Sequence, residues 1–408
     1  MSNKKTALIS LLVIVSVGIV IVVVTSLLTS FFQSRSDLRP EDDKPETTQI
    51  ATNDSSSSNQ TAGTTPIMPT SIDIVSTTSA FPFVQRWVAQ YENQQLGSSG
   101  NVNVNYMADR EIIVAEGGSG RRSNLAIVGV TDKNNNTVYI PVSAQALAIV
   151  YNIPSFPDIP SGLRLNSTTL LLILNGSITR WDDAAIKDLN PSLNLPGERI
   201  VVVHNGGENS NGSSSSSMVL LNQYLGHPIS NWPKNDSIAA SGPADLAEMV
   251  RKIPYSIGYV DFSYAVQTKM TYAAIGDGNG DYIIPSMQSI GQAVNVALQF
   301  HNYSIDRSAS QQQQLPPTIN ASRIINDSYP IVGLYYASLS AKDNDKQEEE
   351  GRRRIVAMLD FVTWIITESG GQQTLLEVEY PPIYPGNEQL ATFAKITIDT
   401  IQKSLINP

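Results

Sequence analysis

The feature that most constrains this chain is a short apolar strand that runs into a loop rich in serine, glycine and asparagine. Ile200 to Val203 form a continuous apolar run, the polar loop follows, and a helical pattern begins at Met218. Backbone N–H groups and hydroxyls gathered at a helix N-terminus bind anions, because the helix dipole favours negative charge there. The segment therefore predicts an α/β unit with an anion cradle at the end of a buried strand.

The composition limits the classes of ligand that such an anion cradle could bind. The 408-residue chain has a net charge of −10, and only 16% of its residues are charged. Nucleic-acid binding depends on clustered Lys and Arg, and the sequence has no basic run longer than the three arginines 352–354, so we expect no nucleic-acid partner. The negative charge also repels anions, so an anion site must be built locally. The length is sufficient for two lobes with separate cores.

The N-terminal segment is predicted to be a membrane anchor. Residues 6–32 contain no charged side chain, and the run exceeds the roughly 20 residues that span a bilayer. Lys4 and Lys5 precede it, so the positive-inside rule assigns residues 1–5 to a cytoplasmic stub and the binding domain to the extracellular side. A cleaved signal peptide is the alternative, although its apolar region usually has about 7–15 residues.

The segment after the apolar run is predicted to be a tether. Residues 33–68 are polar and rich in Ser, Thr, Asn and Asp, so they cannot bury enough apolar surface to fold. We expect a disordered, flexible link between the membrane and the domain. The chain has no cysteine, which excludes a lipid-anchored lipoprotein, disulfides and any cysteine-based metal or redox site.

Beyond the tether, strand and helix patterns alternate. Apolar runs that predict strands lie at 72–75, 111–115, 125–128, 138–151, 200–203 and 329–338. Helical spacing of apolar residues occurs at 81–91, 243–252 and 355–366. Such alternation favours parallel α/β sheets.

The sequence resembles the phosphate-binding solute-binding proteins of ABC transporters, the PstS type. The family pattern G-x-I-x-x-W-x-D-x-x-I-x-x-L-N-P-x-x-x-L-P is matched by Gly176, Ile178, Trp181, Asp183, Ile186, Leu189, Asn190, Pro191, Leu195 and Pro196. Residues 251–265 resemble the family's R-x-x-P-x-x-I-G-Y-V-x-x-x-Y-A segment. Tyr329–Gly333 and the helix that holds Asp360, Phe361 and Trp364 resemble its closing strand and helix.

The resemblance implies a two-lobed α/β fold, the type II periplasmic-binding-protein fold, with a cleft between the lobes. Lobe 1 would comprise residues 69–147 and 329–408, and lobe 2 residues 148–328, after one N-terminal transmembrane helix. It also implies a monomeric extracellular receptor that captures inorganic phosphate for the permease subunits of an ABC importer. It implies neither an enzyme nor a cofactor.

The resemblance also implies where lobe 1 would contact phosphate. The loop before Phe81-Pro82 offers Thr78 and Ser79, although aligning Phe-Pro puts Ala80 in the ligand position. A plain helix N-cap is the alternative for this loop. Later in the lobe, Ser119 would be a hydroxyl donor and Asp132 the acceptor of the ligand's proton. An ordinary turn and a solvated carboxylate are the alternatives for these two.

Lobe 2 departs from the family at its ligand loop. Asn205 stands where the family has an arginine, and Ser213, Ser214, Ser215 and Ser216 would form the cradle. An amide does not replace a bidentate guanidinium, so Arg121 or Arg122 from the opposite lobe would supply the charge. The alternative is a merely flexible serine loop, with Asn211 as a glycan acceptor. A diverged fold that has lost phosphate, and serves as a surface or adhesion protein or binds another ligand, therefore stays open as a second function.

Nothing in the sequence indicates catalysis or a metal site. The three histidines, His204, His227 and His301, lie far apart, so a metal site is not expected. Asp182 and Asp183 precede a helix pattern, where carboxylates stabilise the helix N-terminus. The segment from Gly276 to Asp281 resembles the calcium-binding loop of an EF-hand, but it lacks the helix and the final glutamate of that loop. We therefore predict a hairpin turn.

Overall fold

The computed structural model describes residues 70–95, 102–109, 125–129, 131, 137–154, 162–206, 215–229, 231–299, 318–320, 327–340, 349–384 and 386–406. All of them lie in the unit Pro66–Pro408. The predicted stub, anchor and tether fall outside these ranges. Among the helices within them, none combines the length and the apolar character that crossing a bilayer requires.

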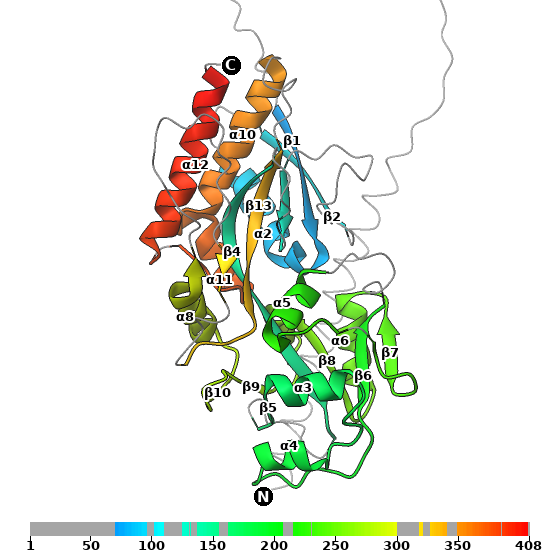
Figure 1. Cartoon of the computed structure of the whole chain (residues 1–408). Coiled ribbons are helices and arrows are strands. Elements are labelled where there is room, and N and C mark those ends of the chain that lie inside the picture. Colours follow the sequence, from blue (N-terminus) through cyan, green and yellow to red (C-terminus); the bar gives the residue numbers. More distant parts are fainter. Residues whose placement is uncertain are drawn as a thin grey trace, which may run out of the picture. The chain divides into compact units, whose positions relative to one another are not determined.

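One eight-stranded sheet organises the described residues (Figure 1). Its strands lie in the order β2-β1-β3-β13-β4-β8-β6-β7. Their bounds are β1 Thr70–Thr77, β2 Val102–Asp109, β3 Leu125–Val128, β4 Thr137–Asn152, β6 Val201–Asn205, β7 Ser237–Ala240, β8 Ser256–Asp261 and β13 Val332–Ser340.

The sheet is mixed, which corrects the expectation of parallel sheets. β1, β2 and β3 pair in parallel, and so do β6, β7 and β8. In the centre, β13 is antiparallel to both β3 and β4, and β4 is antiparallel to β8. The chain leaves the first group of strands along β4 and returns to it along β13. Because these two strands are neighbours in the sheet and carry the chain in opposite directions, they pair antiparallel.

β4 joins the two groups of strands. Its 16 residues are buried almost throughout. Residues 137–146 pair with β13, and residues 147–152 pair with β8. The pairing partner therefore changes at Leu147. This position coincides with the proposed end of the first lobe segment.

Two smaller sheets complete the strand pairing. β5 (Arg164–Leu165), β9 (Ala274–Gly276) and β10 (Tyr282–Ile283) form one, and β11 (Leu298–Gln299) and β12 (Thr318–Ile319) form the other. β9 and β10 are antiparallel, with Gly276 opposite Tyr282. This pairing confirms the hairpin turn that the sequence predicts between Gly276 and Asp281.

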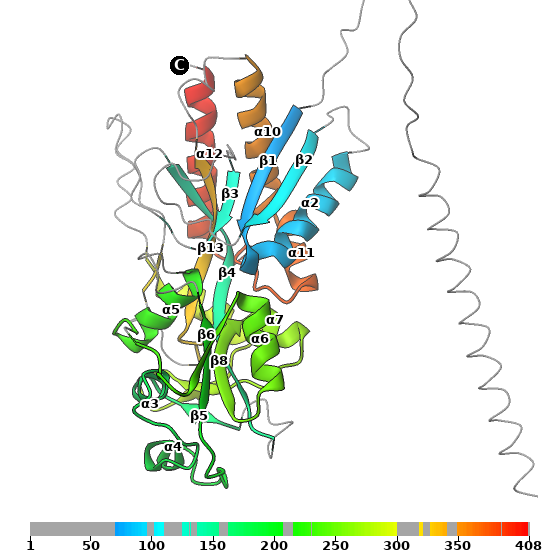
Figure 2. The ribbon, with the colours of Figure 1, turned by 90° about the vertical axis from the view of Figure 1, so that its right-hand side faces the viewer.

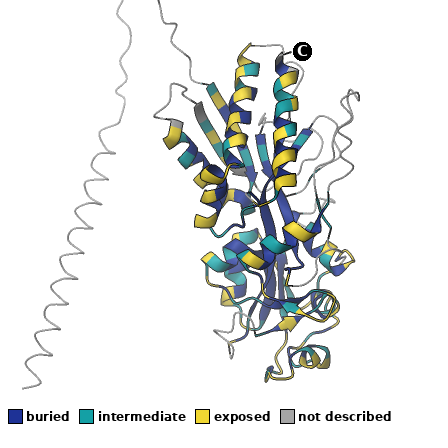
Figure 3. Ribbon diagram, turned by 90° about the vertical axis from the view of Figure 1, so that its left-hand side faces the viewer, coloured by how far each residue is buried: buried dark blue, intermediate teal, exposed yellow. Residues whose placement is uncertain are grey.

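The helices cover the sheet faces, and the strands between them are the most buried part of the ribbon (Figures 2 and 3). The α-helices are α2 Phe81–Gln95, α3 Ser167–Leu174, α4 Ala184–Leu189, α5 Ser216–Leu225, α6 Pro243–Lys252, α7 Phe262–Gln267, α8 Met287–Ala297, α10 Glu349–Ile365, α11 Gln373–Glu377 and α12 Glu388–Ile406. α2 and α10 pack against β1, and α6 packs against β8, β4 and β6.

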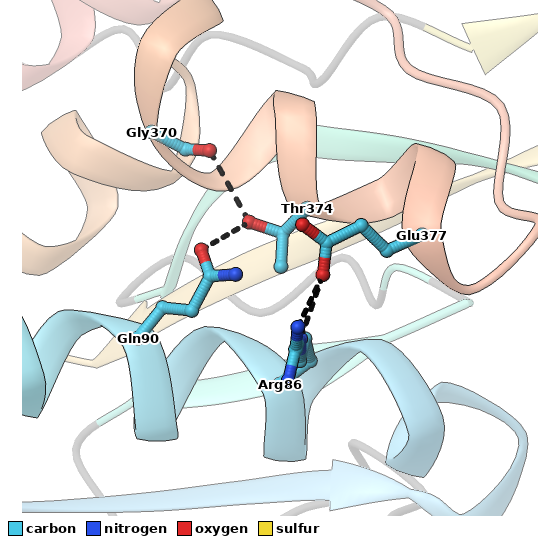
Figure 4. A network of polar contacts seen from close by, with 5 residues as sticks. All are labelled: Arg86, Gln90, Gly370, Thr374 and Glu377. Carbon is cyan, nitrogen blue, oxygen red and sulfur yellow. Dashed lines mark hydrogen bonds and ion pairs between the residues drawn. The ribbon is translucent and has the colours of Figure 1, made fainter.

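A network of polar contacts joins α11 to α2 (Figure 4). The Arg86 Nε atom donates to Glu377 Oε2 at 2.8 Å. The Thr374 hydroxyl bonds to Gln90 Oε1 at 3.1 Å and to the Gly370 carbonyl at 3.2 Å. α11 is thereby held against the helix that follows β1.

The two aspartates after Trp181 have structural roles. Trp181 is fully buried, and its indole N–H donates to the Tyr255 carbonyl at 3.0 Å. Asp183 caps α4 by accepting from the Ala185 N–H at 2.9 Å. Asp182 forms ion pairs with Arg180 and Lys187. The capping interpretation is thus confirmed for Asp183, and Asp182 has partners of its own.

Candidate functional site

Thr78 and Ser79 lie in a short turn that joins β1 to α2. They belong to the 3₁₀ turn Thr78–Ala80, and both are half-buried, whereas Ala80 is fully buried. The Ser79 hydroxyl lies 3.2 Å from Thr77 Oγ1, and the Ser79 carbonyl accepts from the Tyr380 hydroxyl at 2.7 Å. Ser79 is therefore positioned at the N-terminus of the 15-residue helix α2.

The serine loop leads into α5, which begins earlier than the sequence predicts. The helix starts at Ser216 and not at Met218, because the Ser215 hydroxyl caps it by accepting from the Met218 N–H at 3.2 Å. A cap of this kind accepts from the third residue of the helix. Ser216, the first helical residue, is buried.

Gln145 connects α5 to the central strands. It is 2% exposed on β4, and its Nε2 donates to Ser216 Oγ at 2.8 Å. Gly129, directly after β3, closes the other side: a Cβ built on it would lie 2.6 Å from both Gln145 Oε1 and Ser216 Cβ. The end of β3, the middle of β4 and the N-terminus of α5 therefore meet at one place.

Tyr335 links Gln145 to the first turn of α2. Tyr335 is fully buried on β13, and its hydroxyl donates to Asp261 Oδ2 at 3.0 Å. Burial raises the pKa of Tyr335, and the side chains of Ser79 and Gln145, which lie near its hydroxyl, oppose that shift. We call Ser79, Gln145, Ser216, Asp261 and Tyr335 the Gln145 cluster.

Asp261 is the one carboxyl group in the Gln145 cluster. It ends β8 and caps α7, where its Oδ1 accepts from the Ser263 N–H at 3.0 Å. Burial raises the pKa of Asp261 to about 6, and its hydrogen bonds with Tyr335 and Ser263 oppose that shift. The carboxyl group therefore titrates close to neutrality.

Asn205 lies at the carboxyl end of β6, in the strand that leads to the serine loop. It is half-buried, and its backbone N–H donates to the Tyr259 hydroxyl at 3.3 Å. Its neighbour His204 stacks on Trp232, with ring centroids 4.3 Å apart. Burial lowers the pKa of His204. The hydrogen bonds found between described residues do not join the Asn205 side chain to the Gln145 cluster.

Five of the ten predicted ligand residues lie in the described ranges, namely Thr78, Ser79, Asn205, Ser215 and Ser216. Ser79 and Ser216 share the Gln145 cluster, with Thr78 and Ser215 next to them in sequence. Ser119, Arg121, Asp132, Ser213 and Ser214 lie outside the described residues. Within the described ranges, no group of three or more His, Asp or Glu side chains could hold a metal ion.

Sequence reasoning missed Gln145, Tyr335 and Asp261. A signal existed for Gln145, since it is the one amide in the interior of a 16-residue strand of otherwise small, apolar or aromatic character. Asp261 follows the apolar run 257–260 and precedes a short helix, a position that suggests only a cap. Tyr335 is an aromatic residue in a buried strand, so its sequence context indicates nothing but core packing.

The described residues form a mixed α/β fold, and comparison with known proteins identifies the family. Residues 54–369 match the PBP superfamily domain, and the chain belongs to that family. It is 26% identical over 332 residues to the phosphate-binding protein PstS of Methanocaldococcus jannaschii, covering 74% of this chain and 80% of the relative. It is 28% identical over 321 residues to PstS of Xylella fastidiosa, covering 75% and 79%.

A solved structure supports the same fold. A periplasmic phosphate-binding protein with bound phosphate superimposes with a TM-score of 0.52 at 15% identity, over 79% of this chain and 93% of that protein. At this identity the likeness concerns the fold alone. The resemblance to PstS-type proteins is confirmed, and these relatives are named as binding proteins and not as enzymes.

Proposed function

We propose that this chain captures inorganic phosphate outside the cell and delivers it to the permease subunits of an ABC importer. Its membership of the PBP superfamily and its PstS relatives support the proposal. The observation that carries it is the connection of two helix N-termini through one buried polar cluster. Ser216 at α5 accepts a hydrogen bond from Gln145, and the side chains of Gln145 and of Ser79 at α2 both lie near the Tyr335 hydroxyl. Helix N-termini favour negative charge.

The proposed ligand set combines both parts of the sheet. Thr78, Ser79, Ser119, Ser213, Ser214, Ser215 and Ser216 would donate hydroxyl or backbone hydrogen bonds. Asp132 would accept the ligand's proton, which favours phosphate over sulfate. Arg121 would supply the positive charge, because Asn205 occupies the arginine position of the family.

The proposed arrangement in the cell follows from the N-terminal sequence. Residues 6–32 would anchor the chain as a single-pass membrane protein with a cytoplasmic stub at 1–5, and residues 33–68 would tether the domain. The domain would act as a monomer. Residues 69–147 with 329–408 and residues 148–328 would form lobes that close on the ligand by a hinge motion. β4 and β13 would connect them.

Calorimetry tests the function. The purified full chain is titrated with phosphate, with sulfate as the control anion, and then compared with Asp132→Asn. We expect heat with phosphate and not with sulfate, and loss of most of the phosphate affinity in the variant. Asp188→Asn, on the exposed side of α4, is the matched control and should bind like the wild type.

A second candidate function is favoured by Asn205. An amide in the arginine position weakens anion binding, so a fold that has exchanged phosphate for another ligand or a surface role would carry this change. No heat at millimolar phosphate, with a cooperative unfolding transition intact, would support this second function and refute the first.

A further inference from the structure

The sequence contains ten Asn-x-Ser/Thr sequons, the motif that N-linked glycosylation requires. Four of the acceptor asparagines lie in the described residues, namely Asn166, Asn175, Asn235 and Asn320. For Asn320 the hydroxyl residue of the sequon, Ser322, lies outside them. A sequon is modified on an exposed loop of a chain that reaches the extracellular side. The surroundings of the asparagine and of its hydroxyl residue therefore separate the other three.

Asn175 and Ser177 form an exposed turn at the end of α3. The Ser177 N–H donates to Asn175 Oδ1 at 2.9 Å, and both residues are exposed. In the described part of the chain, neither Asn175 Nδ2 nor the Ser177 hydroxyl has a hydrogen-bond partner. The nitrogen that would accept a sugar and the hydroxyl that the sequon requires are thus both presented to solvent.

The backbone fixes this turn. The Asn175 N–H donates to the Leu171 carbonyl at 3.0 Å, and the Gly176 N–H donates to the Ile173 carbonyl at 3.0 Å. Gly176 has a φ of +80°, and a Cβ built on it would lie 3.0 Å from Pro233 Cβ. A residue with a side chain would be strained here. The bend therefore depends on glycine, and it holds the sequon in one exposed conformation of the folded protein.

The other two sequons lie in regular structure. Asn166 is the half-buried N-cap of α3, and its hydroxyl residue, Thr168, belongs to the helix. The Asn235 sequon ends on Ser237, the first residue of β7, and the Ser237 hydroxyl donates to the Pro233 carbonyl at 2.6 Å. A helix or a paired strand holds its backbone in hydrogen bonds, whereas an exposed turn is free to enter the active site of another protein.

We propose that Asn175 is an N-glycosylation site whose substrate is a lipid-linked oligosaccharide. Asn175 Nδ2 forms a bond to the anomeric carbon of the first sugar, and the bond from that carbon to the lipid phosphate oxygen breaks. The lipid phosphate leaves with the electron pair of that bond, and one Nδ2 proton passes to a base of the oligosaccharyltransferase. This inference rests on the extracellular placement in the proposed function.

Mass spectrometry of the full chain, isolated from the cell that encodes it, tests the site. Trypsin releases residues 165–180 as one peptide, which contains both the Asn166 and the Asn175 sequons. Fragmentation that leaves sugars attached should locate a glycan on Asn175 and none on Asn166. The peptide 235–251 should be unmodified. An unmodified peptide 165–180, or a glycan on Asn166 in place of Asn175, would overturn the proposal.

Two matched variants test whether the sequon directs the modification. Ser177→Ala removes the hydroxyl and leaves the acceptor in place, so the glycan on Asn175 should be lost. Thr168→Ala makes the equivalent change in the Asn166 sequon, and the glycan on Asn175 should remain. Persistence of the glycan in Ser177→Ala would contradict the proposal.

Phosphate binding is the separate readout for the proposed function. The hydrogen bonds of the turn in the described part of the chain run to α3 and within the turn. The segment between α3 and α4 lies at the opposite end of the ribbon from α10 and α12 (Figure 1). Asn175→Gln should therefore bind phosphate like the wild type. A wild type that binds phosphate but carries no sugar on Asn175 overturns the modification alone, whereas a glycosylated wild type that gives no heat with phosphate refutes the proposed function alone.

Discussion

Asp261 is a buried carboxyl group whose charge the fold tolerates without a cationic partner among its described contacts. Its neighbours are the Tyr335 and Tyr380 hydroxyls and the Ser263 side chain and backbone N–H. Hydrogen bonds from neutral groups offset only part of the desolvation of a carboxylate. The pKa of Asp261 is therefore raised from 3.8 to about 6.

Asp261→Asn should change how stability depends on pH. The folded state holds the Asp261 proton up to about pH 6, whereas the unfolded chain releases it near 3.8. The folded state thus binds more protons between these values, and stability falls as pH rises through this window. A shift of about 2 units corresponds to about 3 kcal/mol. Asparagine mimics the protonated acid, so the variant should lose this slope.

Urea unfolding of the full chain between pH 4 and 7.5 measures the difference. The variant should gain stability relative to the wild type as pH rises and should match it most closely near pH 4. Asp188→Asn, which changes an exposed carboxylate, provides the baseline for the pH dependence of the rest of the chain. A constant offset between wild type and Asp261→Asn over the whole range would contradict the expectation.

At the scale of elements, Gln372 is a second buried glutamine, and both of its amide atoms have hydrogen-bond partners. Gln372 Nε2 donates to the carbonyls of Val142 at 2.9 Å and Ile365 at 3.0 Å. Its Oε1 accepts from the N–H groups of Ile383 at 2.9 Å and Tyr384 at 3.1 Å. One side chain thereby joins β4, the end of α10 and the segment that leads to α12.

Gln372→Met should be strongly destabilising. The substitution leaves two N–H groups and two carbonyls without partners in a buried place, and we expect a loss of about 3 kcal/mol or more. Gln145→Met removes an amide whose Nε2 bonds to Ser216 Oγ but whose buried Oε1 has no partner among the described residues, so it should cost less than about 1 kcal/mol. Chemical denaturation of both variants gives the comparison. Equal losses would show that the free oxygen of Gln145 carries no penalty.

Most elements could be predicted from the sequence, because they are local. The apolar run 125–128, the long extended segment 138–151 and the helix at 243–252 follow from periodicity and end signals alone. The direction of the central strands could not be predicted. The antiparallel pairing of β4 with β13 joins segments almost 200 residues apart, and no local pattern records it.

The candidate site divides in the same way. Ser79 and Ser216 were predicted as ligand residues from the resemblance to the family's loops, and their position at helix N-termini is one that local rules for hydroxyl residues also favour. Tyr335 and Asp261 come from β13 and β8, and their meeting depends on strand order alone. Gln145 carried a local signal, a polar residue in a buried strand, but its partner Ser216 lies 71 positions away. Contacts between side chains that strand order brings together therefore could not be predicted from local sequence patterns.

At the scale of the whole molecule, the proposed receptor depends on a segment that precedes the described domain. A binding protein that is held at the membrane stays near its permease, and a tether of residues 33–68 leaves it free to reach the transporter. Residues 6–32 lack any charge, and Lys4 and Lys5 precede them. A spanning helix and a cleaved signal peptide are the two physical interpretations of such a sequence.

Expression of the full chain with its own N-terminus in a host cell distinguishes the two. An uncleaved anchor keeps the protein in the membrane pellet after alkaline carbonate extraction, because an apolar run of this length costs too much free energy to transfer to water. Protease added outside the cell should remove the domain. A variant without residues 6–32 should be found in the soluble fraction inside the cell, since it lacks any export signal. Release of the full chain by carbonate, with an intact mass that begins after residue 32, would instead establish cleavage.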